Sequence, residues 1–266
     1  MYLEHWGLKR PPFQNVPDTE YFMETSKHQE ALFRLLYVVK GNKGSAMLTG
    51  EVGCGKTLMC FMLLQELKKE NYDSVVITNP CLPPLDFLKQ IYEGLGGDPV
   101  PKSKREVLKA MTRRSEEKIR EGREIVILID EAHLIMDRPS VYEEIRMLLN
   151  YQKRDRFLFN LILVGQPELL SSITKVPQLR QRIAIKFHLE PLSLLETQNY
   201  ILHRMKIAGG EREIFSSSGV EEAFRQSNGV PRRINSVCDL SLLIAFGNKR
   251  ERIEREDVRN IRELLV

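Results

Sequence analysis

Residues 46–67 read AMLTGEVGCGKTLMCFMLLQEL, which is a short apolar run, a glycine-rich loop and a longer apolar stretch. The loop from Gly50 to Thr57 matches the pattern GxxxxGK[ST], with a predicted strand before it and a predicted helix after it. Glycines let a backbone turn tightly enough to direct consecutive N–H groups at phosphate oxygens, and the following helix adds the positive end of its dipole. This stretch therefore predicts an α/β domain that binds a nucleotide by its phosphates.

Each polar side chain at the end of the loop has an expected task. Lys56 is expected to reach the β- and γ-phosphates of ATP, and the Thr57 hydroxyl to ligate Mg²⁺. Cys54 is interpreted as a small side chain tolerated between glycines rather than as a redox switch. The residues predicted to surround the phosphates are Gly50, Glu51, Val52, Gly53, Cys54, Gly55, Lys56, Thr57 and Leu58.

Short apolar runs alternate with longer amphipathic stretches over residues 45–164. Strands are expected at AMLT, SVVITN, EIVILID and FNLILV, and IAIKFHL at 183–189 adds a fifth. Continuous apolar strands interleaved with helices are typical of a parallel sheet covered on both faces. The predicted fold class is α/β: a P-loop NTPase core with a parallel five-stranded sheet and a small helical lid.

The alternation ends at Pro191, and helical patterns separated by glycine-containing turns follow it. We therefore expect three parts: an N-terminal leader over residues 1–44, an ATPase core over 45–190 and a helical lid over 191–266. The leader carries a helical pattern near its end, between His28 and Val39.

Composition limits the cellular locations expected for the protein but does not identify its binding partner. The 266 residues contain four cysteines without a CxxC pair, and the net charge of +4 is small for this length. No run of about 18 apolar residues occurs, and the opening MYLEHWGLKRPPF lacks the order of a signal peptide. These features predict a cytoplasmic protein without direct membrane insertion, for which nucleic-acid binding is permitted but not indicated.

Two carboxylates follow the apolar run EIVILI, at the edge where parallel α/β folds bind ligands. Asp130 is expected to hold the Mg²⁺ shell, and Glu131 to act as the general base that activates the attacking water. His133 is interpreted as an ordinary residue of the strand-to-helix junction rather than as a second base.

The chain resembles the ExeA/GspA-like AAA+ ATPases of bacteria, a group related to the transposition ATPases TnsC, TniB and MuB. The resemblance rests on YLEHWGLKRPPF, HQEALFRLLYVV, LTGEVGCGKT, ILIDEAHLI, LILVGQPEL, LRQRI, GVPRRIN and CDLSLLIAF, which together cover nearly the whole length. Longer secretion-type members continue into a membrane span and a wall-binding region that residues 1–266 do not include.

The resemblance implies roles for residues outside the phosphate loop. Gln166 occupies the polar position that senses the γ-phosphate, and either Arg180 or Arg182 is placed to reach a neighbouring subunit's nucleotide, with Arg182 preferred. Arg232 of GVPRRIN matches the second sensor, by which the lid touches the nucleotide, with Arg233 as the alternative, and Pro231 is placed beside it at the nucleotide. The adenine pocket is expected to be formed by Pro12, Phe13 and His28.

Three functions stay open from the sequence. The first is an ATP- and Mg²⁺-dependent homo-oligomer, a ring or filament, that drives a secretion, pilus or export apparatus. The second is a duplex-DNA-binding ATPase that regulates a transposase, for which residues 102–123 supply basic side chains mixed with acidic ones. The third is a nucleotide-dependent switch with little turnover, and the presence of Glu131 argues against it.

Overall fold

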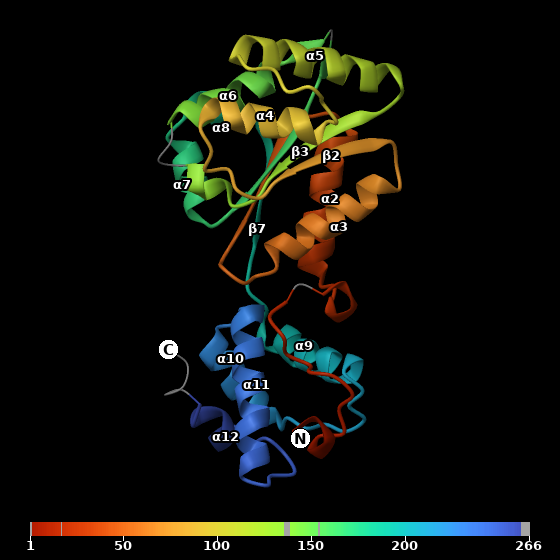
Figure 1. The fold of residues 1–266 in the computed structure, drawn as a ribbon. Coiled ribbons are helices and arrows are strands. Elements are labelled where there is room, and N and C mark those ends of the chain that lie inside the picture. Colours follow the sequence, from red (N-terminus) through yellow and green to blue (C-terminus); the bar gives the residue numbers. More distant parts are fainter. Residues whose placement is uncertain (1, 17, 136–138, 154, 262–266) are drawn as a thin grey trace. The chain divides into compact units, whose positions relative to one another are not determined.

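The computed structural model describes residues 2–16, 18–135, 139–153 and 155–261. They form two compact units (Figure 1). The α/β unit comprises residues 27–50 and 56–189, and the helical unit comprises residues 1–26, 51–55 and 190–266. The division into leader, core and lid that the sequence suggests remains a prediction.

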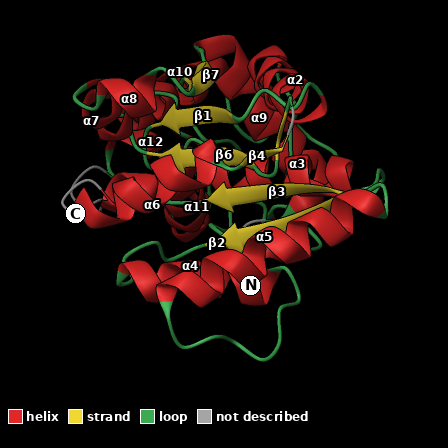
Figure 2. Ribbon diagram, turned by 90° about the horizontal axis from the view of Figure 1, so that it is seen from above, coloured by secondary structure: helices red, strands yellow, loops and turns green. Residues whose placement is uncertain are grey.

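A five-stranded sheet is the framework of the α/β unit. Its strands are β1 (Ser45–Gly50), β2 (Tyr72–Ile77), β3 (Glu124–Ile129), β6 (Asn160–Gly165) and β7 (Ile183–Leu189). The order is β2-β3-β6-β1-β7, and every neighbouring pair is parallel. In Figure 2 the arrows of β2, β3, β6 and β1 lie side by side and point the same way. The predicted sheet is confirmed.

Burial explains why these runs became central strands. Every residue of β1 and β6 is buried, as expected for strands covered on both faces. Alternate residues of β3, namely Ile125, Ile127 and Ile129, share one hydrophobic core with residues of the helices α4, α5 and α6. The helices of this unit are α2 (Ser26–Lys40), α3 (Lys56–Lys68), α4 (Pro84–Gly94), α5 (Lys104–Arg120), η2 (Ala132–Ile135), α6 (Pro139–Asn150), α7 (Glu168–Thr174) and α8 (Pro177–Arg180).

A short hairpin, β4 (Gln152–Lys153) and β5 (Arg156–Phe157), has no counterpart among the predicted elements. Asn42 pairs with it: the Asn42 Nδ2 donates to the Phe157 carbonyl oxygen at 3.1 Å, and the Phe157 amide donates to Asn42 Oδ1 at 2.7 Å. Strands of two residues are too short to carry an alternating pattern, which is why the sequence did not reveal them.

The helical unit combines α1 (Tyr2–His5) and η1 (Thr19–Tyr21) with α9 (Leu194–Ile207), α10 (Ser217–Ser227), α11 (Pro231–Gly247) and α12 (Arg255–Arg259). Trp6 is 1% exposed, and its indole N–H donates to the Leu242 carbonyl oxygen at 3.0 Å. Trp6 and Phe13 share a core with Ile234 and Cys238 of α11. The first residues of the chain are thus part of the hydrophobic core of this unit.

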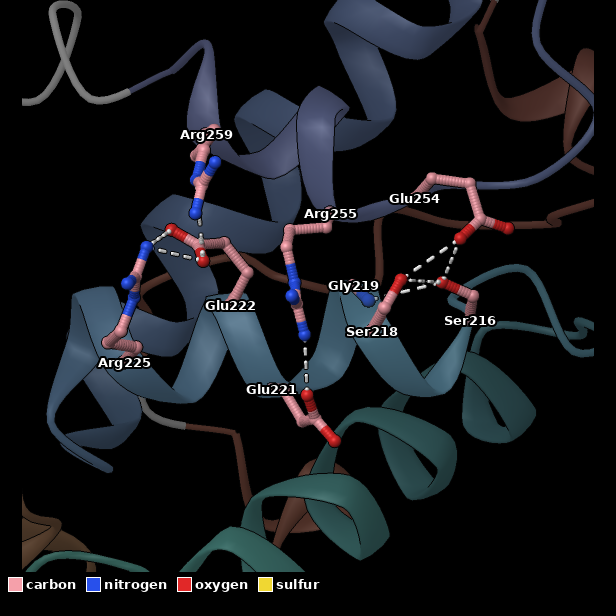
Figure 3. Close-up of polar contacts among 9 residues, drawn as sticks. All are labelled: Ser216, Ser218, Gly219, Glu221, Glu222, Arg225, Glu254, Arg255 and Arg259. Carbon is pink, nitrogen blue, oxygen red and sulfur yellow. Dashed lines mark hydrogen bonds and ion pairs between the residues drawn. The ribbon is translucent and has the colours of Figure 1, made fainter.

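Ionic contacts join α10 to the segment around α12 (Figure 3). Glu222 is buried, and its carboxylate accepts from Arg225 at 2.7 Å and lies 4.0 Å from Arg259. Burial opposes ionisation of Glu222, but the hydrogen bonds from Arg225 and its neighbours outweigh burial and lower the Glu222 pKa. Glu254 accepts from the Ser216 hydroxyl, which itself caps α10, at 2.6 Å. These contacts tie α10 to the segment around α12.

Candidate nucleotide site

Three glycines of the phosphate loop occupy positions that tolerate no side chain. Gly53 and Gly55 have positive φ angles of 86° and 93°, a region that favours glycine. Gly50 ends β1 so close to β7 that an added Cβ would lie 2.7 Å from the Leu189 carbonyl oxygen. The loop therefore has the tight turns that a phosphate-binding backbone needs.

Lys56 begins α3 directly after the loop, and its side chain turns back on the loop. Lys56 is 6% exposed, and its ammonium group donates to the Gly50 carbonyl oxygen at 2.8 Å. The positive charge is therefore held at the mouth of the loop, where the sequence predicts phosphate groups.

Thr57 and Asp130 meet in the α/β unit. The Thr57 hydroxyl donates to Asp130 Oδ2 at 3.3 Å, and Asp130 Oδ1 accepts from the Glu131 amide at 2.9 Å. Asp130 lies one residue beyond β3, and its own amide donates to the Ile77 carbonyl oxygen at 2.9 Å. The two side chains predicted to hold Mg²⁺, the Thr57 hydroxyl and the Asp130 carboxylate, thus lie within hydrogen-bonding distance of each other.

This oxygen pair suits Mg²⁺, which prefers oxygen ligands and commonly takes one or two protein carboxylates together with water and substrate phosphates. Among the residues that the structure describes, no group of three or more His, Cys, Asp or Glu could hold a metal ion alone. Thr57 and Asp130 fit a metal ion that arrives with a nucleotide.

Glu131 stands in a strained backbone position. Its φ angle is +51°, which an L-amino acid with a long side chain rarely adopts, and such outliers concentrate at functional sites. Its side chain is 41% exposed, yet its Oε2 atom is shielded from solvent and makes no hydrogen bond of normal geometry. The His133 Nδ1 atom lies 3.2 Å from this oxygen.

Gln166 follows β6 and contacts the same histidine. Its side-chain Nε2 lies 2.9 Å from His133 Nε2, and its backbone amide donates to His133 Nδ1 at 3.4 Å. Because β3 and β6 are parallel neighbours, with Ile129 opposite Leu163, the residues that follow both strands reach the same sheet edge. The structure therefore joins Glu131 and Gln166 through His133, a connection that the sequence did not reveal.

Within the helical unit, the phosphate loop packs against the start of α11. The Arg232 amide donates to the Gly53 carbonyl oxygen at 3.3 Å, and an added Cβ on Gly53 would lie 2.6 Å from Arg232 Cβ. Pro231 is the first residue of α11, and the side chains of Arg232 and Arg233 are both exposed. Of the three residues Pro231, Arg232 and Arg233, Arg232 is thus the one that forms a hydrogen bond to the phosphate loop, through its backbone amide.

The two arginines predicted to act on a neighbouring subunit are both exposed. Arg180 ends α8, and Arg182 precedes β7, where its carbonyl oxygen accepts from the Ser45 hydroxyl at 2.8 Å. Arg182 also lines an open surface pocket together with Arg146 and Asn150. Arg182 is therefore fixed at its backbone and exposed at its side chain.

The residues predicted to surround adenine are buried. Phe13 is 2% exposed and meets Phe215 edge to face at 6.0 Å, and the Pro12 carbonyl oxygen accepts from Arg204 at 2.5 Å. His28 belongs to α2 and is 8% exposed. Pro12 and Phe13 are part of the helical unit and His28 is part of the α/β unit, so their joint role at adenine remains a prediction.

The cysteines near the loop are buried. Cys54 is 2% exposed, and Cys60 follows Lys56 by one turn of α3. Burial, reinforced by the negative charge of Asp130, raises the pKa of the Cys60 thiol well above its ordinary range. A thiol with a raised pKa is a poor nucleophile, so Cys60 serves packing.

Comparison with known proteins agrees with this geometry. Residues 39–173 match the family model described as AAA domain. The chain therefore belongs to the AAA family, as an ExeA/GspA-like AAA+ ATPase. It is 34% identical to General secretion pathway protein A of Aeromonas hydrophila, over 97% of this chain and 47% of that protein. The chain thus spans about half the length of this relative.

The chain is also similar to a second curated protein and to a solved structure. The chain is 26% identical to the ATP-dependent target DNA activator B of Escherichia phage Mu, over 98% of this chain and 79% of that protein. The ORC2 protein of Aeropyrum pernix has a similar structure, with a TM-score of 0.67 and 18% identity over 95% of this chain and 70% of that chain. At that identity, the second likeness concerns the fold alone.

Within the described parts of the chain, no helix has both the length and the apolar character needed to cross a bilayer.

Proposed function

We propose that this chain binds ATP with Mg²⁺ and hydrolyses it. The observation that carries the proposal is the meeting of Thr57 and Asp130 beside a loop that ends in the buried Lys56. A hydroxyl, a carboxylate and an ammonium group so arranged match what phosphoryl transfer requires of a protein, namely positioning and charge stabilisation.

Each site residue of the α/β unit has its own proposed role in binding or hydrolysis. Lys56 binds the β- and γ-phosphates, while Thr57 and Asp130 hold the metal ion. A bound Mg²⁺ supplies charge neutralisation at the phosphate oxygens. Glu131 orients the attacking water and takes its proton, and Gln166 contacts the γ-phosphate. The strained backbone of Glu131 supports its assignment, because such strain persists where function requires it.

Replacement of Lys56 tests nucleotide binding. We expect Lys56→Ala to weaken ATP and ADP binding about 10- to 100-fold, because a hydrogen bond to a charged group contributes roughly 1.5–3 kcal/mol. Titration calorimetry with Mg²⁺ present measures the affinities. Lys68→Ala, at an exposed position on the same helix, is the matched control. Equal affinity in the Lys56→Ala and unaltered proteins, both folded by circular dichroism, would refute the phosphate site.

The secretion-pathway relative supports a specific use of the ATP cycle. We propose that the chain assembles as a homo-oligomer whose ATP cycle drives assembly or remodelling of a secretion, pilus or export apparatus. An exposed arginine before β7 suits such an assembly, because it can stabilise phosphate charge on a neighbouring copy.

Regulation of a transposase on duplex DNA is the second candidate, favoured by the similarity to the Mu target DNA activator. Arg105, Lys109 and Arg113 recur every four residues on α5 and are all exposed, so they share one face. Several basic residues near α5 are engaged within the protein: Arg113 pairs with Glu117 at 2.9 Å, and Lys118 lies 2.5 Å and Arg123 2.6 Å from the Asp73 carboxylate. The basic surface left for phosphates is therefore narrow.

One measurement separates the two candidates. It is the ATPase rate and the particle mass with and without duplex DNA, each at about 50 and 200 mM salt. A DNA-regulated ATPase shows stimulation that falls steeply with salt, because each phosphate contact releases counterions. A secretion ATPase shows the same rate and mass with and without DNA at each salt concentration.

A further inference from the structure

We infer that His133 is a positioning residue that holds the carboxylate of Glu131 and links it to Gln166, the predicted sensor of the γ-phosphate. The inference rests on the proposed ATP hydrolysis and deepens it. His133, which the sequence assigned only to a strand-to-helix junction, would then transmit nucleotide contact to the general base.

The histidine ring stands between the two functional side chains. His133 Nδ1 lies 3.2 Å from Glu131 Oε2, and His133 Nε2 lies 2.9 Å from Gln166 Nε2. The Glu131 oxygen on this side is shielded from solvent, so water does not replace the histidine contact. An imidazole with its two nitrogens used in opposite directions is well suited to connect two polar groups.

One tautomer serves both side-chain contacts. With the hydrogen on Nδ1, His133 would donate to Glu131 after a small shift of the ring or the carboxylate, because the present 3.2 Å contact is not a hydrogen bond of normal geometry. The unprotonated Nε2 would accept from the Gln166 amide group. In the structure the Gln166 backbone amide donates to Nδ1 at 3.4 Å, and this tautomer would give up that hydrogen bond for the one to Glu131. The hydrogen bonds would then run in one direction, from Gln166 to His133 to Glu131.

The surrounding backbone fixes the ring in place. His133 is part of η2, and its side chain is 13% exposed. At Gly165 an added Cβ would lie 3.1 Å from the His133 amide nitrogen and 3.4 Å from its Nδ1, so this glycine lets the end of β6 approach the ring. The Glu131 carbonyl oxygen accepts from the Leu134 amide at 2.9 Å, which closes the turn that carries the histidine.

This arrangement can couple the sensor to the base. The Gln166 amide group has two hydrogens, one of which serves His133 while the other is free for a phosphate oxygen. Hydrogen bonds in a chain polarise one another, and each fixes the direction of the next. A γ-phosphate at Gln166 would therefore fix the amide, the imidazole and the Glu131 carboxylate together, and ADP, which lacks that phosphate, would not.

The test compares His133→Ala, His133→Asn, Gln166→Ala and the double variant His133→Ala/Gln166→Ala. We expect His133→Ala to lower kcat about 10- to 100-fold, as loss of a supporting hydrogen bond does in other sites, with KM for ATP unchanged within about twofold. His133→Asn should recover part of kcat, because its amide nitrogen can replace Nδ1 toward Glu131. The double variant should be no slower than the slower single variant, because both replacements break the same chain.

His203→Ala, at a partly buried position of α9, is the control for general effects of losing an imidazole and should keep kcat. The inference is overturned if His133→Ala and His133→Asn both retain kcat within about twofold, or if the two losses multiply in the double variant. The Glu131→Gln variant separates this failure from failure of the proposed function: turnover in the unaltered protein that disappears in Glu131→Gln upholds hydrolysis whatever His133 does. Absence of turnover in the unaltered protein would overturn both.

Discussion

Glu131→Gln should bind ATP with nearly unaltered affinity and lose about 10²- to 10⁴-fold in turnover, the range that a general base contributes. Glutamine keeps the length of the side chain but cannot take a proton from water. Binding should survive because the residues predicted to hold phosphate and metal, Lys56, Thr57 and Asp130, are untouched. Phosphate release under saturating Mg-ATP measures turnover, and calorimetry measures affinity.

Glu121→Gln is the control for this experiment, since Glu121 is exposed just beyond α5 and lies outside the site. It should match the unaltered protein in both measurements. Undiminished hydrolysis by Glu131→Gln would remove Glu131 from the mechanism and leave its strained backbone without a functional reason.

Arg182→Ala should lower turnover by about 10³-fold or more, the range observed when an arginine is supplied to a phosphoryl-transfer site by a neighbour. The subunit that carries the replacement keeps all residues predicted to bind its own nucleotide, so its nucleotide affinity should change little. The decisive measurement is a mixture of Arg182→Ala and Glu131→Gln chains. Each variant alone is inactive, but a mixed oligomer contains interfaces at which an intact Glu131 faces an intact Arg182, so turnover should reappear.

Arg180→Ala is the matched comparison, because Arg180 is equally exposed two residues earlier in the chain. If that variant loses turnover and Arg182→Ala does not, the assignment passes to Arg180. No recovery in mixtures, together with a monomeric mass and a specific activity that stays constant on dilution, would exclude a shared site altogether.

The sheet could be predicted because its strands are buried on both faces. The run NLILVG of β6 is buried at every position, and such a run carries its signal without reference to any other part of the chain. The place of Trp6 could not be predicted in this way. Its indole contacts Leu242, 236 residues away, and no local pattern indicates a partner at that distance.

The same distinction applies to the site. Thr57 and Asp130 could be assigned together because residues at the carboxyl ends of parallel strands share one edge of the sheet. The contact between His133 and Gln166 joins residues 33 positions apart and depends on the rotamer of the ring. The left-handed backbone of Glu131 was equally invisible, since glutamate is not a residue type that signals a positive φ.

The left-handed backbone at Glu131 sets the proposed role of this residue as general base against the stability of the fold. Holding a non-glycine residue in such a conformation costs on the order of 1 kcal/mol or more, and glycine would adopt it freely. A population of variants selected only for resistance to heat would therefore be enriched in chains that have given up Glu131. At this position the backbone strain that glutamate carries is a cost in stability, which glycine would remove together with the carboxylate.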